Sequence, residues 1–299
     1  MIKRTLYFGT PAYLKKEKQQ LKVEFPEEDK EPKTVPIEDV GMLILDHPRV
    51  TVTQALLSAL MDNNAALLSC DDRHLPGGLF MPMTANHVYT EKLRYQLEAS
   101  EPLRKNLWQQ TVKAKILNQA AVLSIYNQPV ENMHYWAGQV KSGDPDNYEG
   151  RAAANYWKRI MDDPEFRRGR EEPAPNNLLN YGYAVLRAIV ARSLVSSGML
   201  PAIGIHHSNK YNPFCLADDI MEPYRPYVDL VVLDIQERFE EAELEQLTKD
   251  VKRELLIIPT LDIEIEGKKS PLMVGMQRTT ASLMQCFEGV KRKIAYPLL

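Results

Sequence analysis

The spacing of apolar residues differs between the two ends of the chain. Up to residue 84 the apolar runs are short and separated by turn-forming residues. We predict strands there at Thr5–Phe8, Gln20–Phe25, Met42–Leu45 and Ala66–Cys70. Apolar and charged residues alternate from Leu21 to Phe25, which is the period of a half-buried strand. The charged segment Glu27–Lys33 contains Pro32 and predicts a hairpin loop, whereas Thr53–Met61 has helical spacing and predicts one short helix.

From Asn86 onward, the apolar residues recur with a period near 3.6, which is typical of amphipathic helices. Helices are predicted at Val88–Ser100, Leu103–Tyr126, Tyr148–Met161, Asn177–Ser197 and Glu240–Arg253. Because the composition and the spacing of apolar residues both change near Met81–Ala85, we expect two domains. The predicted fold class is α+β, with a small β-rich domain at residues 1–84 and a larger, all-α domain at residues 85–299.

The composition argues against two classes of protein, those with a globally basic surface and those that cross a membrane. The 299 residues include 37 Lys and Arg against 40 Asp and Glu, a formal net charge of −3, which argues against a globally basic coat for nucleic acids. Any contact with DNA would therefore need local positive patches. No apolar run approaches the roughly 20 residues that cross a bilayer, and the N-terminal residues lack the apolar stretch of a secretion signal. We expect a cytoplasmic protein without membrane contact.

The segment Gly204–Pro226 holds the densest cluster of chemically active side chains, with two histidines, three carboxylates and an arginine. Imidazole and carboxylate groups this close in sequence can converge on one divalent cation, and carboxylate-rich sites favour the hard metals that handle phosphate. Asp219 and Glu222 would share one face of a helix. In the alternative interpretation, Asp218 and Asp219 are solvated surface acids and Glu222 pairs with Arg225. The pattern alone does not separate the two.

A further carboxylate lies upstream, at the start of a predicted helix rich in alanine. Glu149 follows Asp146 by three residues, which is also the spacing of a capping box, in which the N-cap and N3 side chains satisfy backbone donors reciprocally. Spacing alone favours this capping role for Glu149 over a role in a metal site.

Three sequence blocks together resemble one known family. They are Tyr148–Gly150 ahead of the alanine-rich helix, Asn176–Tyr183 at the start of the next helix, and Gly204–Pro226. Their order and spacing resemble the CRISPR-associated protein 1 family, the spacer-acquisition integrase of CRISPR immunity. The early segments Arg4–Leu21, Val40–Leu45 and His74–Pro82 look like the β domain of that family. In length and in its compact N-terminal domain, the chain is most similar to the members from type II systems.

The resemblance implies a set of site residues in the helical domain, which would be the catalytic domain. It assigns the catalytic metal ligands to Glu149, His207 and Glu222. In the family, the functional histidine precedes an aromatic residue by seven positions. The aromatic residue here is Phe214, so the resemblance selects His207 rather than its neighbour His206. Some members have Asp where this chain has Glu222, and both residues supply an anionic oxygen.

Other residues are expected to assist these three. Asp219 lies one turn before Glu222 and is expected to be an auxiliary ligand or to support one. Lys210 matches a position that touches DNA in the family, and Arg225 is a second candidate for DNA contact. A further basic cluster, which could bind phosphates or form a solvated helix face, consists of Arg104, Lys105, Lys113 and Lys115.

The implied activity is that of a CRISPR adaptation integrase. A Mg²⁺ or Mn²⁺ ion would act as a Lewis acid while the 3′-hydroxyl of a prespacer attacks the leader–repeat junction, a transesterification without a covalent enzyme intermediate. With water as the nucleophile, the same site would be an endonuclease. The alternatives are a stand-alone metal-dependent DNA nuclease and a non-catalytic DNA-binding scaffold.

The implied partners are double-stranded DNA, as prespacer and as CRISPR repeat, and other protein chains. The resemblance implies a homodimer, with residues 1–84 as the dimerisation domain, and two such dimers flanking a dimer of CRISPR-associated protein 2. A single active site cannot join both DNA ends, so duplication of the subunit suits the reaction. The type II effector nuclease and its accessory acquisition protein are further candidate partners.

Overall fold

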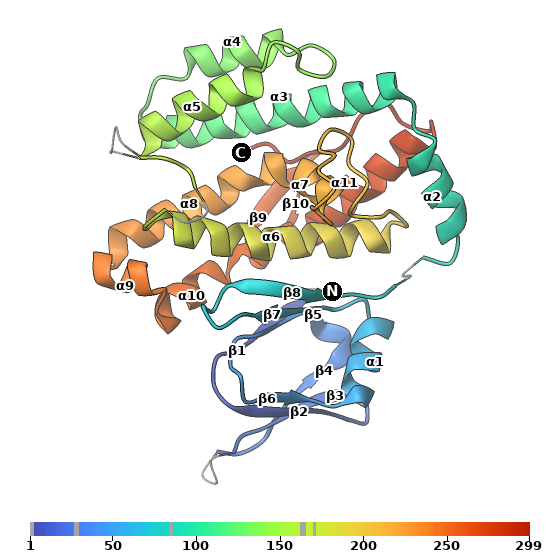
Figure 1. Cartoon of the computed structure of the whole chain (residues 1–299), viewed down its shortest axis with the longest axis vertical. Helices are drawn as coiled ribbons and strands as arrows, with labels where there is room; N and C mark the ends of the chain where they lie inside the picture. The colour runs from blue at the N-terminus through green and yellow to red at the C-terminus, as the bar shows by residue number, and fades with distance from the viewer. Residues whose placement is uncertain (1–2, 27–29, 84–85, 162–165, 170–171) are drawn as a thin grey trace. The chain divides into compact units, whose positions relative to one another are not determined.

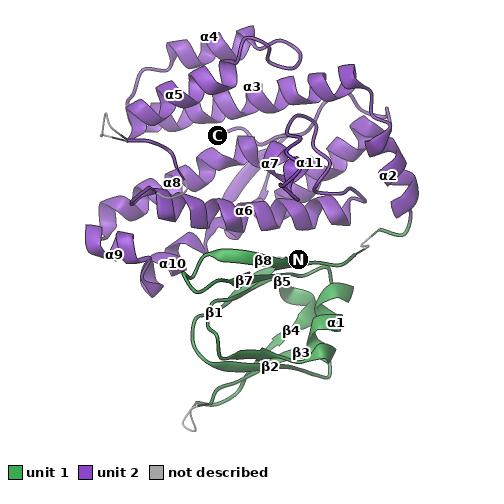
Figure 2. Cartoon of the chain, in the orientation of Figure 1, with its two compact units in different colours: residues 1–87 green, residues 88–299 purple. Residues whose placement is uncertain are grey.

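The computed structural model describes residues 3–26, 30–83, 86–161, 166–169 and 172–299. The chain divides into two compact units, residues 1–87 and residues 88–299 (Figure 2). The domain boundary expected between residues 84 and 85 lies outside the described residues. Each unit is built around its own core.

In its described residues, the first unit contains two four-stranded sheets and one α-helix, α1 (Gln54–Asp62) (Figure 1). The first sheet has the order β1-β5-β7-β8, with β1, β5 and β7 parallel and β8 antiparallel to β7. Its strands are β1 (Arg4–Phe8), β5 (Val40–Leu45), β7 (Ala66–Cys70) and β8 (Pro76–Phe80). The second sheet has the order β4-β3-β2-β6. Its strands are β4 (Lys33–Pro36), β3 (Gln20–Glu24), β2 (Ala12–Glu17) and β6 (Val50–Val52).

The period-two pattern of β3 explains how the second sheet faces the core. Leu21 and Val23 are buried, while Lys22 between them forms ion pairs with Glu17 at 2.7 Å and Glu24 at 3.4 Å. One hydrophobic core is shared by both sheets and α1, through buried residues that include Leu14, Leu21, Leu43, Leu56, Leu60 and Leu67. The alternation in the sequence therefore predicts the buried face of this strand correctly.

The four predicted strands all form, but β2, β4, β6 and β8 were not predicted. β4 and β8 are edge strands that contain Pro36 and Gly77–Gly78, residues that weaken a strand pattern in sequence. β3 and β4 are antiparallel neighbours, as the hairpin prediction for Glu27–Lys33 requires, although residues 27–29 of that loop lie outside the described residues.

The second unit is mainly helical (Figure 1). Its helices are α2 (Tyr89–Leu97), α3 (Glu101–Ile125), α4 (Glu131–Gln139), α5 (Tyr148–Ile160), α6 (Asn176–Ser196), α7 (Cys215–Met221), α8 (Arg225–Arg238), α9 (Glu241–Gln246), α10 (Lys249–Leu255) and α11 (Leu272–Phe287). A single 3-10 turn, η2 (Glu222–Tyr224), joins α7 to α8. Helix α3 packs against α4, α5, η2 and α8, and α6 packs against α7, α8 and α11. These two long helices hold the elements that carry the candidate site.

Four predicted helices form as α2, α3, α5 and α6, with small shifts at their ends. The single helix predicted over Glu240–Arg253 is wrong, because Leu247 adopts a left-handed conformation with φ of 47° and separates α9 from α10. The expectation of an all-α domain misses a two-stranded hairpin, β9 (Asp262–Ile265) and β10 (Lys268–Pro271). Among the described residues, no helix is both long enough and apolar enough to cross a membrane.

Candidate active site

The first turn of α5 directs Glu149 toward the inside of the second unit. Asn147 is the N-cap, and its side chain accepts a hydrogen bond from Gly150 N at 3.2 Å. The carboxylate of Asp144 accepts hydrogen bonds from Tyr148 N at 3.0 Å and Glu149 N at 2.9 Å. These two side chains accept hydrogen bonds from the first backbone N–H groups of the helix. The Glu149 carboxylate is therefore not needed as a cap and can contact other residues.

The capping box predicted for Asp146 and Glu149 is therefore wrong. The Asp146 carboxylate pairs instead with Lys141 at 3.2 Å, and the N-cap lies one residue later, at Asn147. The prediction failed because Asp144, which precedes the N-cap, takes over the role of capping acid and is held in a left-handed conformation with φ of 50°.

Glu222 lies at the junction between α7 and η2, where Pro223 follows it. Its side chain is only 8% exposed. On α3, Asn118 Nδ2 donates a hydrogen bond to Pro223 O at 2.6 Å and so fixes this junction against the long helix. The carboxylate of Glu222 is thereby held opposite the buried face of α3.

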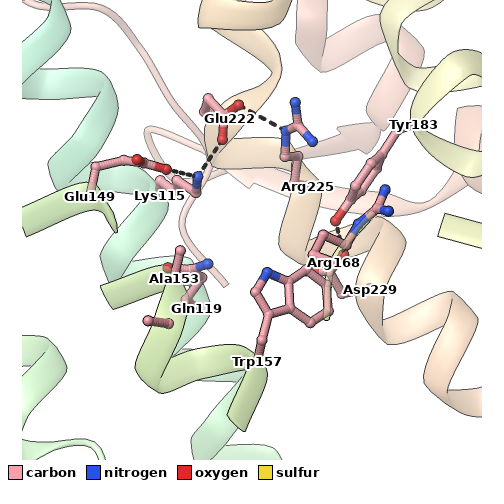
Figure 3. A pocket seen from close by; sticks show the side chains of 11 residues that line it. Lys115, Gln119, Glu149, Ala153, Trp157, Arg168, Tyr183, Glu222, Arg225 and Asp229 are labelled. Atoms are coloured by element: carbon pink, nitrogen blue, oxygen red, sulfur yellow. Dashed lines mark hydrogen bonds and ion pairs between the residues drawn. The ribbon is translucent and has the colours of Figure 1, made fainter. Parts of the chain in front are cut away.

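Lys115 of α3 lies between the two glutamates (Figure 3). Its ammonium group donates a hydrogen bond to Glu149 Oε1 and lies 2.5 Å from Glu222 Oε2. The second oxygen of Glu222, Oε1, forms an ion pair with Arg225 Nε at 2.9 Å. Carboxylates from α5 and η2 thus meet around one ammonium group from α3.

The buried charges keep one another ionised. Burial acts to raise the pKa of the Glu222 carboxyl, but the positive charges of Arg225 and Lys115 outweigh it and lower that pKa. Burial likewise acts to lower the pKa of the Lys115 ammonium, but Glu222 and Glu149 outweigh it and raise that pKa. The cluster is therefore an ionic one at neutral pH.

The interpretation of Lys115 as part of a solvated basic helix face is wrong, because its side chain is only 9% exposed. A signal for its true position exists in the sequence. Thr111, Lys115, Asn118 and Gln119 are all buried polar residues of α3 and lie on one face at helical spacing. A polar stripe on the apolar side of a helix indicates a site.

Asp219 organises the loop that carries His207. Asp219 is fully buried, and its Oδ2 accepts hydrogen bonds from Ile205 N at 2.7 Å and His206 N at 3.0 Å. Its Oδ1 lies 2.6 Å from His207 Nδ1 and accepts a hydrogen bond from His207 N at 3.2 Å. Gly204 is required here because a Cβ would collide with His207 O. Asp219 thus fixes the imidazole, and a metal could be bound only through Nε2.

The two neighbouring histidines have different environments. The hydrogen bond with Asp219 raises the pKa of His207, and the charge of Glu222 adds to this effect. The ring of His206 instead stacks on Trp108, with ring centroids 4.1 Å apart, and burial lowers its pKa. His206 therefore packs on Trp108, while His207 is paired with Asp219 and is influenced by the charge of Glu222.

The alternative interpretation of Asp218 and Asp219 as solvated surface acids is wrong. Asp218 is 8% exposed and forms an ion pair with Arg187 Nε at 2.6 Å. Asp219 is 0% exposed. The other half of that interpretation, the pairing of Glu222 with Arg225, is present and exists together with the contact to Lys115.

The residues expected to contact DNA lie in different surroundings. Lys210 is exposed, and its ammonium group lies 4.8 Å from the ring centroid of Tyr211, which is itself 81% exposed. Arg225 is half-buried, pairs with Glu222 and stacks over the ring of Tyr183 at 4.6 Å. The position of Arg225 is that of an internal counter-charge to Glu222.

A cavity of about 350 Å³ opens beside the Lys115 cluster (Figure 3). Its lining includes three cationic side chains, Lys115, Arg168 and Arg225, and three carboxylates, Glu149, Glu222 and Asp229. Mixed charges of this kind suit a phosphate group held together with a divalent ion.

The donor set fits such an ion, although it is not assembled around a metal position. Within the described part of the chain, no three His, Cys, Asp or Glu side chains are arranged to hold a metal ion. Glu222 Oε2, however, is buried and lies 2.5 Å from the ammonium group of Lys115, so a cation already occupies the place beside this oxygen. A buried anionic oxygen of this kind is suited to bind Mg²⁺ or Mn²⁺.

Comparison with known proteins gives the same result as the sequence blocks. Residues 6–249 match the family described as CRISPR associated protein Cas1. A CRISPR-associated endonuclease Cas1 from Neisseria meningitidis is 37% identical over 285 residues, which cover 94% of this chain and 91% of the relative. A CRISPR-associated endonuclease Cas1 from Pyrobaculum aerophilum is 26% identical over 261 residues, 83% of this chain and 88% of that one.

Solved structures share the fold. A Cas1 protein from Thermotoga maritima superimposes with a TM-score of 0.77 and 17% identity, over 96% of this chain and 97% of that one. A casposase bound to an integration product gives a TM-score of 0.79 at 18% identity, over 98% and 92% of the two chains. The predicted α+β class and the predicted family are confirmed. This chain belongs to the CRISPR-associated Cas1 family of endonucleases.

Proposed function

We propose that this chain is a CRISPR adaptation integrase that joins prespacer 3′ ends to the CRISPR repeat, using one divalent ion held by Glu149, His207 and Glu222. The single observation that carries the proposal is the meeting of the Glu149 and Glu222 carboxylates around one buried ammonium group. When bound, Mg²⁺ or Mn²⁺ would supply Lewis acidity toward the scissile phosphate.

The protein residues would bind the ion, orient the imidazole and stabilise negative charge. Glu149 and Glu222 supply anionic oxygens from two elements that α3 holds in place. Asp219 contacts Nδ1 of His207 and so leaves Nε2 available to bind the ion. Carboxylates commonly fix metal-binding imidazoles in this way. Arg168 and Arg225 line the same cavity and could stabilise negative charge on the phosphate and on the leaving 3′-oxygen.

Relatives support DNA as the substrate. A Cas1 structure described as a Cas1–DNA complex superimposes with a TM-score of 0.57, and the casposase structure contains an integration product. For this chain, we propose that the exposed pair of Lys210 and Tyr211 contacts DNA near the site. Because the net charge is −3, such local contacts would carry the binding.

We further propose that the chain acts as a homodimer through residues 1–84 and together with CRISPR-associated protein 2. A Cas6-RT-Cas1–Cas2 complex superimposes on this chain with a TM-score of 0.72, which supports that partner. The duplication of the subunit would supply one active site for each prespacer end. The type II effector nuclease and its accessory acquisition protein remain candidate partners of the assembly.

A strand-joining assay tests the proposal. With labelled prespacer, supercoiled repeat plasmid and Mn²⁺, Glu149→Gln and His207→Ala should each reduce joining by about a hundredfold or more, while DNA binding is retained. Asp146→Asn is the matched control, because Asp146 lies beside the same helix start but pairs with Lys141. This control should join DNA at the wild-type rate.

The outcomes separate the alternatives. Plasmid cutting without joining would favour a stand-alone nuclease. Joining at the wild-type rate in both Glu149→Gln and His207→Ala would contradict the proposed metal site and favour a scaffold that binds DNA without catalysis.

A further inference from the structure

We propose that Lys115 is a resident cation that holds Glu149 and Glu222 together in the metal-free protein and that must leave Glu222 when a divalent ion binds. This inference rests on the proposed function, because it assumes that the ion binds these two glutamates. It assigns to Lys115 the role of a positioning residue that sets how tightly the site binds metal.

The position of Lys115 leaves only its side chain free to move. Its backbone lies in the middle of α3, a 25-residue helix that packs against α4, α5, η2 and α8. The ammonium group contacts both glutamates in the space between them. A lysine has a flexible four-carbon stem with a compact charge at its end, so the charge can be relocated without any change in the helix.

The charges of the cluster are already balanced without a metal. Two carboxylates, Glu149 and Glu222, face two cations, Lys115 and Arg225. A divalent ion would add two positive charges in a buried place where like charges repel strongly, since the effective dielectric constant is low. Arg225 pairs with the other oxygen of Glu222, so Lys115 is the cation that stands where the ion would bind.

The cavity offers a place for the displaced ammonium group. Gln119 lies one turn after Lys115 on the same face of α3 and lines the same cavity. The side-chain oxygen of Gln119 is buried and accepts no hydrogen bond from the described residues, and the residue is 3% exposed. A buried acceptor without a donor is unfavourable, which makes Gln119 Oε1 the receiving group for Lys115.

Mn²⁺ binding to the DNA-free protein tests the inference. We would measure free Mn²⁺ by electron paramagnetic resonance for the wild type, Lys115→Met, and the control Lys113→Met, which changes a partly exposed lysine of the same helix. Removal of the competing charge should tighten Mn²⁺ binding by about tenfold or more in Lys115→Met. Lys113→Met should bind as the wild type does. Equal or weaker binding by Lys115→Met would overturn the inference.

A second variant covers the case in which Lys115→Met does not fold. Gln119→Leu leaves every proposed ligand intact but removes the acceptor, so it should weaken Mn²⁺ binding by about tenfold. Unchanged affinity in Gln119→Leu would overturn the transfer to Gln119.

A third variant distinguishes this inference from the proposed function. If Glu149→Gln weakens Mn²⁺ binding while Lys115→Met does not tighten it, the inference on Lys115 fails and the metal site stands. If Glu149→Gln leaves Mn²⁺ binding unchanged, the proposed metal site itself fails, and the inference fails with it.

Discussion

Asp229 is one of the three carboxylates that line the cavity, and its partners are the hydroxyl groups of two tyrosines. It is 1% exposed, and it accepts hydrogen bonds from Tyr183 OH at 2.5 Å and Tyr156 OH at 2.9 Å. Burial raises its pKa from 3.8 to about 6, although both tyrosine hydrogen bonds and the charges of Arg225 and Arg168 act in the opposite direction. Its ionisation is therefore linked to the stability of the fold.

The sign of this linkage gives a pH-dependent prediction. Because the folded-state pKa lies above the ordinary value, the contribution of Asp229 is fully present below pH 3.8 and is lost as the pH rises to about 6. Relative to the wild type, Asp229→Asn should therefore gain about 2 kcal/mol in the free energy of unfolding between pH 4 and pH 7. Chemical denaturation at both pH values measures the difference.

Asp234→Asn is the matched control for this experiment, because Asp234 is an exposed carboxylate on the same helix, α8. Its stability relative to the wild type should change far less over the same range. A constant difference between wild type and Asp229→Asn would show that the fold does not depend on this proton.

At the residue scale, some site residues could be predicted from the sequence more readily than others. The segment around His207 and Glu222 is chemically dense, so its importance can be inferred from composition alone. Glu149 needed the family resemblance, because its spacing to Asp146 equally suits a cap. The polar stripe on α3 marks Lys115 as a candidate, but the partners of Lys115 and Asp229 lie on other helices, and no local pattern predicts those partners.

At the scale of elements, α3 is the scaffold of the candidate site. Asn118 of this helix makes three hydrogen bonds, donating to Pro223 O at 2.6 Å and Pro297 O at 3.1 Å and accepting from Leu299 N at 3.0 Å. It thereby ties the turn after Glu222 and the segment 297–299 to the same point of α3. Loss of this side chain would leave buried backbone groups without partners.

Asn118→Ala should accordingly lower the free energy of unfolding by about 3 kcal/mol, because each unsatisfied buried group costs on the order of 1 to 3 kcal/mol. Asn106→Ala is the control, since Asn106 is an exposed asparagine on the same helix. Urea denaturation of both variants measures the effect. A similar, small loss in both would mean that the turn after Glu222 is held by other contacts.

Elements with a clear period were predictable, and elements without one were not. Helices α3, α5 and α6 follow from apolar spacing, whereas α8 is buried on most of its surface and shows no polar face to mark its period. The break between α9 and α10 depends on the single left-handed residue Leu247, a residue type that rarely adopts that conformation.

At the scale of the whole molecule, the two compact units differ in their proposed tasks. Glu149, His207 and Glu222 all belong to the unit formed by residues 88–299, together with Lys115 and Asp229. The first unit contributes none of these residues, and its use in dimerisation stays a prediction. Its parallel strands β1, β5 and β7 were predicted as strands, but their pairing order could not be deduced from alternation alone.

The central claim is that side chains from α5, the loop before α7, and η2 converge on one divalent ion. A crystal structure of the wild-type protein with Mn²⁺, using the anomalous scattering of manganese, measures this directly. We predict one anomalous peak at about 2.0 to 2.2 Å from Glu149, His207 Nε2 and Glu222. A structure with no peak between these three side chains, or with Mn²⁺ bound only by other residues, would contradict the account.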